Sequence, residues 1–372
     1  MYEKYAAALQ QAGAEVELVE LRFDDGKSLI NGAYAGQVPK RRFGFEHRFR
    51  SRIRLLKSLE RMVLDSRKLR ERRRLISYLQ ASGATRFVAV DPWALELCAL
   101  AQRLAHAKIF YVPMEPYRHK IGVHERRRQQ FRRLERRHMP RVAGAVYMGE
   151  RIRSDYVSAY GGPEHSHVIY NSCPLDATTQ TKGLRRSAGI GAGEIIVLYS
   201  GSMEIPRGVT DLVSAMARTP ASSRLVLMGY GRGVDETRQH VHQAGVNDRV
   251  VFLPATPQKD LVSFIADADV GVIPFRSQLG LAFGCPGKMF EYMAAALPLV
   301  VSDCPDTRNV VTTHGLGEVF QPQDVADLSR ALNALITSHD YRNQCAQNVR
   351  RCQESVFCWE LQSAKLAQII LR

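Results

Sequence analysis

The chain of 372 residues is 45% hydrophobic and 24% charged, which is typical of a globular protein that folds in water. This length is too great for one ordinary hydrophobic core and predicts two domains. The sequence holds no apolar run of about 18 residues and no apolar stretch near its start, so we expect neither a membrane-spanning helix nor a signal peptide. Its seven cysteines include no CxxC pair, which disfavours a disulfide framework or a zinc site and favours a reducing cytoplasm.

The net charge of +15 and the isoelectric point near 9.7 indicate an anionic partner. The excess positive charge lies in two clusters of the N-terminal half, Lys40–Arg74 and Arg118–Arg141. Three interpretations are open: solvated helix faces, nucleic-acid binding, and docking on anionic lipid headgroups. The third is favoured, because Phe43–Leu64 mixes aromatic and aliphatic residues with arginines as an interfacial helix would. Under the first interpretation the glutamate partners would be Glu60, Glu71, Glu125 and Glu135.

The N-terminal half predicts alternating strands and helices, and it opens on a helix rather than a strand. The predicted strands are Val16–Leu21, Phe87–Val90, Lys108–Val112 and Gly144–Tyr147. The predicted helices are Leu56–Leu79, Ala94–Ala105 and Gln129–Met139. A turn-rich stretch, Asn171–Gly193, predicts the linker between the halves. We therefore expect a first domain over residues 1–175, joined by the last helix at 357–372, and a second domain over 176–356.

The C-terminal half shows the same alternation with longer apolar runs. The predicted strands are Glu194–Ser200, Arg224–Met228, Val250–Leu253, Val270–Pro274 and Pro298–Ser302. The predicted helices are Val209–Arg218, Val234–Ala244, Lys259–Ala268, the one that carries Glu291, Asp324–Ile336, Asp340–Cys352 and Phe357–Leu371. Unbroken apolar strands separated by helices predict a parallel sheet that is covered on both faces. In such sheets ligands bind at the carboxyl ends of the strands.

One helix of this half carries the strongest functional signal. A Pro286–Gly287 turn opens it, and Lys288 and Glu291 follow three residues apart in the first turn, so both should point toward one face. The free amides of a helix start attract an anion, and a lysine beside them adds a full charge. A glutamate can accept hydrogen bonds from two neighbouring hydroxyls, as a ribose offers. This pattern predicts a nucleotide site, and the alternative is a surface ion pair between the two side chains.

Four ordered segments of the C-terminal half resemble the GT-B glycosyltransferases of family 4, also called glycosyl transferases group 1. They are Tyr199–Ser202 with Pro206–Gly208, Leu227–Gly231, Asp267–Phe275 and Pro286–Ala294. Three weaker segments of the N-terminal half fall in the expected order: Ala89–Trp93, Tyr111–Pro116 and Ile169–Asn171. The resemblance implies an α/β chain with the GT-B fold. That fold has two Rossmann-like domains facing across a cleft, and a C-terminal helix that crosses back to the first domain.

By position, the resemblance implies that Arg207 and Lys288 hold the donor diphosphate and that Glu291 holds the ribose. The further donor-binding residues would be Gly201, Ser202, Gly229, Gly231, Pro254, Ala255, Phe283 and Gly284. On the acceptor side Glu115 would be the nearest titratable group, although capping or a loop salt bridge would explain it equally. No metal-binding loop is expected, because Asp267 and Asp269 stand at a helix-to-strand junction where acids are commonly just solvated.

The function implied is a retaining, metal-independent glycosyltransferase without a cofactor. It would move a sugar from a UDP- or GDP-sugar to a glycolipid or polysaccharide precursor, such as that of lipopolysaccharide. The enzyme would be cytoplasmic and peripheral on the inner face of the membrane. The alternatives are a nucleotide-sugar epimerase on the same scaffold, a catalytically silent binding module and a nucleic-acid binder. The binding module is favoured somewhat by Phe283, which stands where many members carry an acid, and by Met114, which stands where many carry a histidine.

Overall fold

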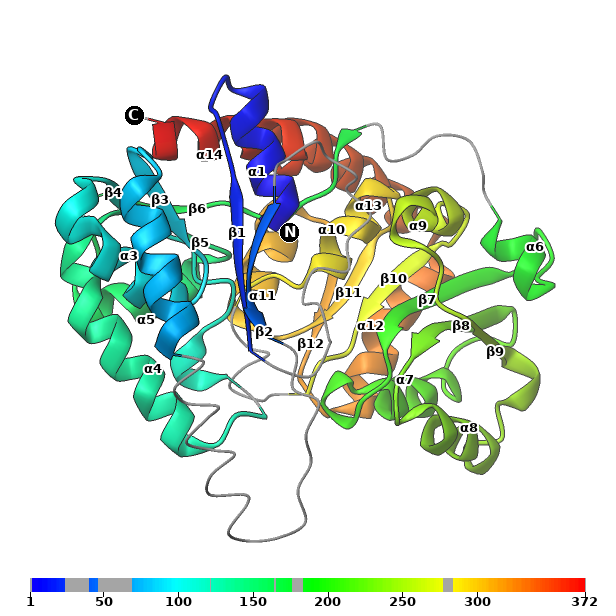
Figure 1. The fold of residues 1–372 in the computed structure, drawn as a ribbon. Helices are drawn as coiled ribbons and strands as arrows, with labels where there is room; N and C mark the ends of the chain where they lie inside the picture. The colour runs from blue at the N-terminus through cyan, green and yellow to red at the C-terminus, as the bar shows by residue number, and fades with distance from the viewer. Residues whose placement is uncertain are drawn as a thin grey trace, which may run out of the picture. The chain divides into compact units, whose positions relative to one another are not determined.

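The computed structural model describes residues 2–23, 40–45, 69–120, 122–163, 165–175, 183–276 and 284–371. The chain divides into two compact units. Unit 1 comprises Met1–Tyr147, Arg153–Ile169 and Ser363–Arg372, and unit 2 comprises Met148–Ile152 and Tyr170–Gln362. Each unit is built on a parallel β-sheet with helices between successive strands (Figure 1).

Unit 2 contains a six-stranded sheet in which every strand pair is parallel. Its strands are β7 (Ile195–Ser202), β8 (Ser223–Tyr230), β9 (Val250–Leu253), β10 (Val270–Ile273), β11 (Leu299–Ser302) and β12 (Gly317–Phe320). The spatial order is β12-β11-β10-β7-β8-β9, so the strand order reverses between β7 and β10. The first five strands were predicted, and β12 was not.

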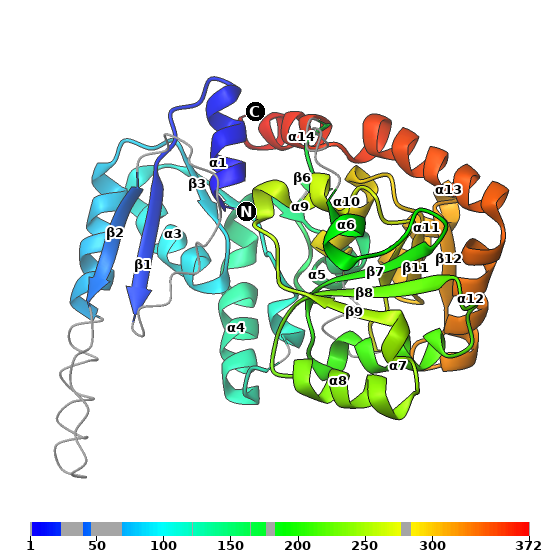
Figure 2. The same cartoon turned by 90° about the vertical axis from the view of Figure 1, so that its right-hand side faces the viewer.

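Helices cover both faces of this sheet, because its central strands are apolar on both sides (Figure 2). Along β7, Ile196 and Leu198 join one core, while Val197 and Tyr199 join the other. One core is completed by α7 (Val209–Met216), α8 (Val234–Gln243) and α12 (Val325–Thr337). The other is completed by α6 (Leu184–Ala188), α9 (Gln258–Ile265), α10 (Gly287–Ala294), α11 (Pro305–His314) and α13 (His339–Cys352). The predicted alternation and the covered parallel sheet are confirmed.

Unit 1 contains a four-stranded parallel sheet in the order β3-β4-β5-β6. Its strands are β3 (Arg86–Ala89), β4 (Lys108–Tyr111), β5 (Val142–Tyr147) and β6 (His165–Val168), and the helices between them are α3 (Pro92–Ala105), α4 (Glu125–His138) and α5 (Glu150–Tyr160). The chain opens on α1 (Tyr2–Gln11) and ends on α14 (Trp359–Leu371). A hydrogen bond of 2.8 Å from Arg86 Nη2 to the carbonyl oxygen of Leu371 ties the end of α14 to the start of β3.

A separate two-stranded sheet corrects one expectation about the first basic cluster. β1 (Leu18–Phe23) pairs in parallel with β2 (Lys40–Phe45). The interfacial helix expected over Phe43–Leu64 is therefore wrong at its start, because Phe43 and Phe45 are strand residues. Aromatic residues favour strands, and here pairing with β1 determines the local conformation. Residues 46–68 lie outside the described part of the chain.

The expectation that Glu135 pairs with arginines on a solvated face is also wrong. Glu135 is fully buried and accepts hydrogen bonds from the hydroxyls of Tyr156 (2.6 Å), Tyr160 (2.8 Å) and Tyr111 (2.8 Å). Burial raises the pKa of Glu135, and these three hydrogen bonds oppose that effect. Three hydroxyl donors satisfy the buried carboxylate, so Glu135 is a structural residue of unit 1.

Two other glutamates do pair on the surface, Glu71 with Arg74 and Glu125 with Arg128 and Arg132. Glu60 lies outside the described residues.

Most of the second basic cluster lies on α4. The exposed arginines of this helix are Arg126, Arg127, Arg133, Arg136 and Arg137, while Phe131, Glu135 and His138 are buried. Within the described ranges, no helix is both long and apolar enough to cross a bilayer.

Candidate functional site

Two of the residues that the sequence singled out, Arg207 and Lys288, meet at the carboxyl ends of β7 and β10 in unit 2. These two strands lie side by side at the point where the strand order reverses. Chain segments that leave neighbouring strands here in opposite directions open a crevice, which is where ligands bind in such sheets. β7 leads into the short helix η4 (Ile205–Arg207) and then α7, and β10 leads into Pro274, Phe275 and Arg276.

A glycine allows the two segments to touch. Gly208 has a φ of 67°, and a Cβ atom built on it would lie 1.8 Å from the carbonyl oxygen of Pro274. Both the left-handed backbone and this close approach require glycine. The contact places Arg207 over the buried ring of Phe275, with 4.8 Å from the guanidinium carbon to the ring centroid. Arg207 is therefore held against the end of β10 and is not an ordinary solvated residue of a helix start.

Lys288 reaches the same place from α10. Its Nζ lies 3.9 Å from the centroid of the Tyr199 ring and 5.6 Å from that of Phe275. Gly201, at the end of β7, has a φ of 122°, and a Cβ atom there would lie 3.0 Å from Nζ of Lys288. A larger residue at position 201 would therefore crowd the ammonium group. Lys288 thus lies over the rings of Tyr199 and Phe275, and Arg207 lies over the ring of Phe275. Cation–π attraction stabilises both side chains in these positions.

The ammonium group of Lys288 is buried, and within the described residues it has no hydrogen-bond partner. The pKa of Lys288 falls from its ordinary value of 10.5 to about 7, because burial disfavours the charged form and Arg207 repels it, while Glu291 acts weakly in the opposite direction. No ion pair joins Lys288 to Glu291 in the described part of the chain, so the surface-pair alternative is wrong. A buried cation without a counterion is costly. Lys288 is such a group, and Arg207 adds a second positive charge over the same Phe275 ring, an arrangement that favours an anion here.

Glu291 lies one turn further along α10, and its Oε1 accepts a hydrogen bond of 2.9 Å from Nε2 of Gln258 in α9. This bond fixes the carboxylate between the two helices. Pro254 and Ala255 are exposed directly after β9.

The remaining glycines join the ends of β7 and β8. Gly201 pairs with Gly229 in register, and a Cβ atom on Gly229 would lie 1.9 Å from the carbonyl oxygen of Gly201. Gly231 has a φ of 134°, and a Cβ atom there would lie 3.0 Å from the amide nitrogen of Met203. The carbonyl oxygen of Ser202 accepts a hydrogen bond from Tyr199 Oη at 2.5 Å. The structure thus gives these positions a packing role at the base of the site.

Gly284 precedes α10 and is anchored by an acid that the sequence did not single out. Its amide donates to Oδ2 of Asp306 at 2.9 Å, and the amide of Arg151 donates to Oδ1 of the same carboxylate at 3.0 Å. Asp306 is buried. An acid in the first turn of a helix is common, so no local signal marks it. Phe283 lies outside the described residues.

Glu115 lies in unit 1 and is exposed. Its Oε2 forms an ion pair of 3.0 Å with Nζ of Lys120, which corresponds to the loop salt bridge considered as its alternative role.

The acids Asp267 and Asp269 serve the opposite end of the sheet. Oδ2 of Asp269 accepts from the amide of Ile196 at 2.7 Å and from Nη2 of Arg185 at 3.0 Å. Oδ2 of Asp267 accepts from the amide of Arg185 at 3.2 Å. They fix the amino ends of β7 and β10. Among the described residues, no three histidine, cysteine or acidic side chains are grouped as metal ligands.

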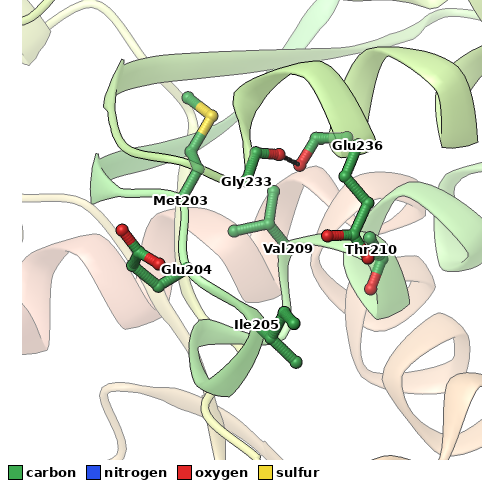
Figure 3. A pocket seen from close by; sticks show the side chains of 8 residues that line it. Met203, Glu204, Ile205, Val209, Thr210, Gly233 and Glu236 are labelled. Carbon is green, nitrogen blue, oxygen red and sulfur yellow. Dashed lines mark hydrogen bonds between the residues drawn. The ribbon is translucent and has the colours of Figure 1, made fainter.

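A small pocket borders the site on the side of α8 (Figure 3). Its lining residues come from the turn between β7 and η4, from η4, from α7, and from α8 and the residue before it: Met203, Glu204, Ile205, Val209, Thr210, Gly233, Glu236 and Thr237. Two carboxylates make this pocket unsuited to a diphosphate. Neither Arg207 nor Lys288 lines it.

Comparisons with known proteins match the part of the chain that carries these residues. Residues 180–351 match the family model "Glycosyl transferases group 1". A D-inositol 3-phosphate glycosyltransferase of Xylanimonas cellulosilytica is 28% identical over 200 residues, which are 53% of this chain and 46% of that protein. The chain spans about half the length of the curated relatives it matches.

Solved structures extend the likeness to the whole chain. The lipopolysaccharide outer core galactosyltransferase WaaB matches with a TM-score of 0.70 at 16% identity, covering 100% of this chain and 94% of its own. HepE of Anabaena, solved in complex with UDP-glucose, matches with a TM-score of 0.69 at 17% identity, covering 95% of this chain and 98% of its own. The chain therefore has the GT-B fold, and the match to the group 1 glycosyltransferase model covers the part of it that carries Arg207, Lys288 and Glu291.

Proposed function

We propose that this chain is a glycosyltransferase that takes a sugar from a UDP- or GDP-sugar and transfers it with retention of configuration and without a metal ion. The observation that carries the proposal is the buried ammonium group of Lys288, which lies beside Arg207 and has no hydrogen-bond partner among the residues that the structure describes. Breaking a glycosyl phosphate bond builds negative charge on the departing diphosphate. Two fixed cations in a partly dry crevice stabilise that charge. Loss of one such group typically costs about 3 kcal/mol of the barrier, or about a hundredfold in rate.

Each candidate residue has a separate task in this reaction. The amides at the start of α10, together with Lys288 and Arg207, hold the diphosphate. Glu291 accepts the ribose hydroxyls one turn further on, and Gln258 keeps its carboxylate in place. The uracil or guanine base lies near Pro254 and Ala255. The UDP-glucose bound by the structural neighbour HepE supports a nucleotide-sugar donor.

The acceptor in this proposal is a glycolipid or a polysaccharide precursor at the cytoplasmic face of the inner membrane, as in lipopolysaccharide synthesis. Support comes from the exposed arginines of α4 and from the likeness to a lipopolysaccharide galactosyltransferase. Each arginine near an anionic surface contributes about 1 kcal/mol of binding free energy.

Calorimetry with UDP, GDP and their sugars, followed by transfer assays, tests the donor part. Glu291→Gln and Lys288→Met should each weaken nucleotide binding at least about tenfold, whereas Lys259→Met, which removes an exposed lysine of α9, should not. Absence of binding to any nucleotide would refute the proposal. Donor turnover without an acceptor would indicate an epimerase, and binding without turnover would indicate a silent binding module.

Vesicle sedimentation tests the membrane part. The double variant Arg136→Gln/Arg137→Gln should lose binding to vesicles that contain phosphatidylglycerol. The matched control Arg350→Gln/Arg351→Gln removes two exposed, adjacent arginines from α13 of unit 2 and should bind as the unmodified chain does. Equal binding by both variants would contradict α4 as the docking surface.

A further inference from the structure

Arg276 directs all of its described hydrogen bonds at the turn that carries Arg207. Its amide donates to the carbonyl oxygen of Pro206 at 3.0 Å. Its guanidinium donates to both carboxylate oxygens of Asp211, from Nη2 to Oδ1 at 2.7 Å and from Nε to Oδ2 at 2.9 Å. A fourth bond runs from Nη2 to Oγ1 of Thr210 at 3.1 Å. This fork-to-fork arrangement is the strongest geometry that an ion pair adopts.

The four bonds bracket Arg207 on both sides. Pro206 precedes it in η4, and Thr210 and Asp211 follow it in the first turn of α7. Between these points, Gly208 packs on Pro274. The segment Pro274–Arg276 after β10 therefore contacts the chain both before and after Arg207. Its Phe275 ring packs against the guanidinium group of Arg207.

These contacts oppose an electrostatic force. Arg207 and Lys288 carry like charges over the same Phe275 ring and repel each other, so a loosened turn would move Arg207 away from the ammonium group. Asp211 already occupies the guanidinium of Arg276, and it raises the pKa of that group. Arg276 is therefore neutralised within the protein and acts on an anion through Arg207.

We propose that Arg276 is a positioning residue that holds Arg207 beside Lys288 and thereby sets the affinity of the anion site. The inference rests on the proposed function for its biological ligand, but the anion site can be tested separately. Inorganic pyrophosphate presents the diphosphate charge without a base or a sugar, so it serves as the probe.

The matched control is Arg224, which has the same kind of contact at the other end of the sheet. Its Nε donates to Glu194 at 2.5 Å and its Nη1 donates to the carbonyl oxygen of Asp248 at 3.0 Å. Its side chain is 27% exposed, against 26% for Arg276. Loss of either arginine removes a half-buried ion pair, but only Arg276 lies beside Arg207.

Calorimetric titration with pyrophosphate and with UDP should show Arg276→Met at least tenfold weaker than the unmodified protein, and Arg224→Met within twofold of it. Arg276→Lys should not restore affinity, because lysine keeps the charge but cannot bind both carboxylate oxygens. In the Arg207→Ala background, Arg276→Met should cause no further loss, since the two act as one unit. Asp211→Asn removes the carboxylate that pairs with Arg276 and should weaken pyrophosphate binding as Arg276→Met does. If Arg276→Met folds poorly, Asp211→Asn provides a second test.

Several results would overturn the inference. They are unchanged pyrophosphate affinity in Arg276→Met, a full additional loss in the Arg207→Ala background, or an equal loss in Arg224→Met. If the unmodified protein binds pyrophosphate through Arg276 but binds no nucleotide, the inference holds and the proposed function fails. If it binds neither, both fail.

Discussion

Replacement of Lys288 by methionine should stabilise the ligand-free protein, although it destroys the proposed site. Methionine has nearly the length of lysine and no charge, so it can occupy the space beside Tyr199 without a desolvated ammonium group. The sign follows from proton binding. The pKa of Lys288 is about 7 in the folded chain and near 10.5 when solvated, so between these values the unfolded chain binds more protons. The destabilisation is therefore complete below pH 7 and disappears as the pH rises toward 10.5.

The size of the effect follows from the same two values. A difference of about 3.5 pKa units corresponds to about 5 kcal/mol, at about 1.36 kcal/mol per unit. Because the two pKa values determine how many protons each state binds, nearly all of this, about 5 kcal/mol, applies at pH 6, and about 2 kcal/mol applies at pH 9. For a domain of 150–250 residues, about 1 kcal/mol shifts the melting temperature by about 2–4 °C. The advantage of the methionine variant should therefore fall by more than half between pH 6 and pH 9.

Thermal melts of ligand-free protein at pH 6, 7, 8 and 9 provide the measurement. Lys259→Met is the control, because Lys259 is exposed on α9, and its melting temperature should follow that of the unmodified chain at each pH. A methionine variant with no gain at pH 6 would refute the reasoning. A gain that is equal at every pH would also refute it, since only apolar packing would then explain the result.

Two further predictions concern residues with a structural role, Gly208 in unit 2 and Glu135 in unit 1. Gly208→Ala should destabilise the chain by more than about 2 kcal/mol, because an alanine in the left-handed conformation costs about 1–2 kcal/mol and its Cβ would lie 1.8 Å from the carbonyl oxygen of Pro274. Calorimetry should also show that this variant no longer binds pyrophosphate. Unchanged binding would contradict the contact between Gly208 and Pro274. Glu135→Gln should destabilise the chain by about 2 kcal/mol, since the amide group cannot accept from every tyrosine that now donates to the carboxylate, whereas Glu125→Gln on the same helix should change the melting temperature far less. Equal melting temperatures for these two variants would argue against the buried cluster.

The sequence predicted the elements where hydrophobic burial alone determines them. The strands of unit 2 are apolar on both faces, so β7 to β11 stand out from the helices between them. β12 (Gly317–Phe320) was missed, because three of its four residues are only partly buried and it mixes glycine and glutamate with two apolar positions. β2 was missed because its run of basic residues resembles a solvated segment, and only pairing with β1 explains the strand.

The sequence predicted those residues of the candidate site that belong to local motifs. The turn before α10 marks Lys288 and Glu291, and the resemblance marks Arg207. The supporting residues Phe275, Arg276 and Asp306 were missed, because their partners lie far away in sequence. Arg276 contacts Asp211, which lies 65 positions earlier, and Asp306 contacts Arg151, which lies 155 positions earlier. Such contacts exist only once the sheet has brought the strand ends together, and no spacing rule anticipates them.

A comparison of two buried charges, Lys288 and Glu135, shows why only Lys288 indicates a ligand. Both are removed from water, which carries a large free-energy penalty for a charged group. The chain offsets that penalty for Glu135 with three hydroxyl donors, so nothing remains for an outside molecule to satisfy. Lys288 has two aromatic rings and a second cation beside it. Glu291 attracts it only weakly and forms no ion pair with it in the described part of the chain, and the sequence at 277–283 contains no acid. Arg207 lies beside Lys288 although it makes the charged form of Lys288 less favourable. In our proposal the hydrogen bonds of Arg276 keep Arg207 in this position. An arrangement that is unfavourable in the free protein becomes favourable when a dianion enters, because the diphosphate then supplies the missing counter-charge to both groups at once.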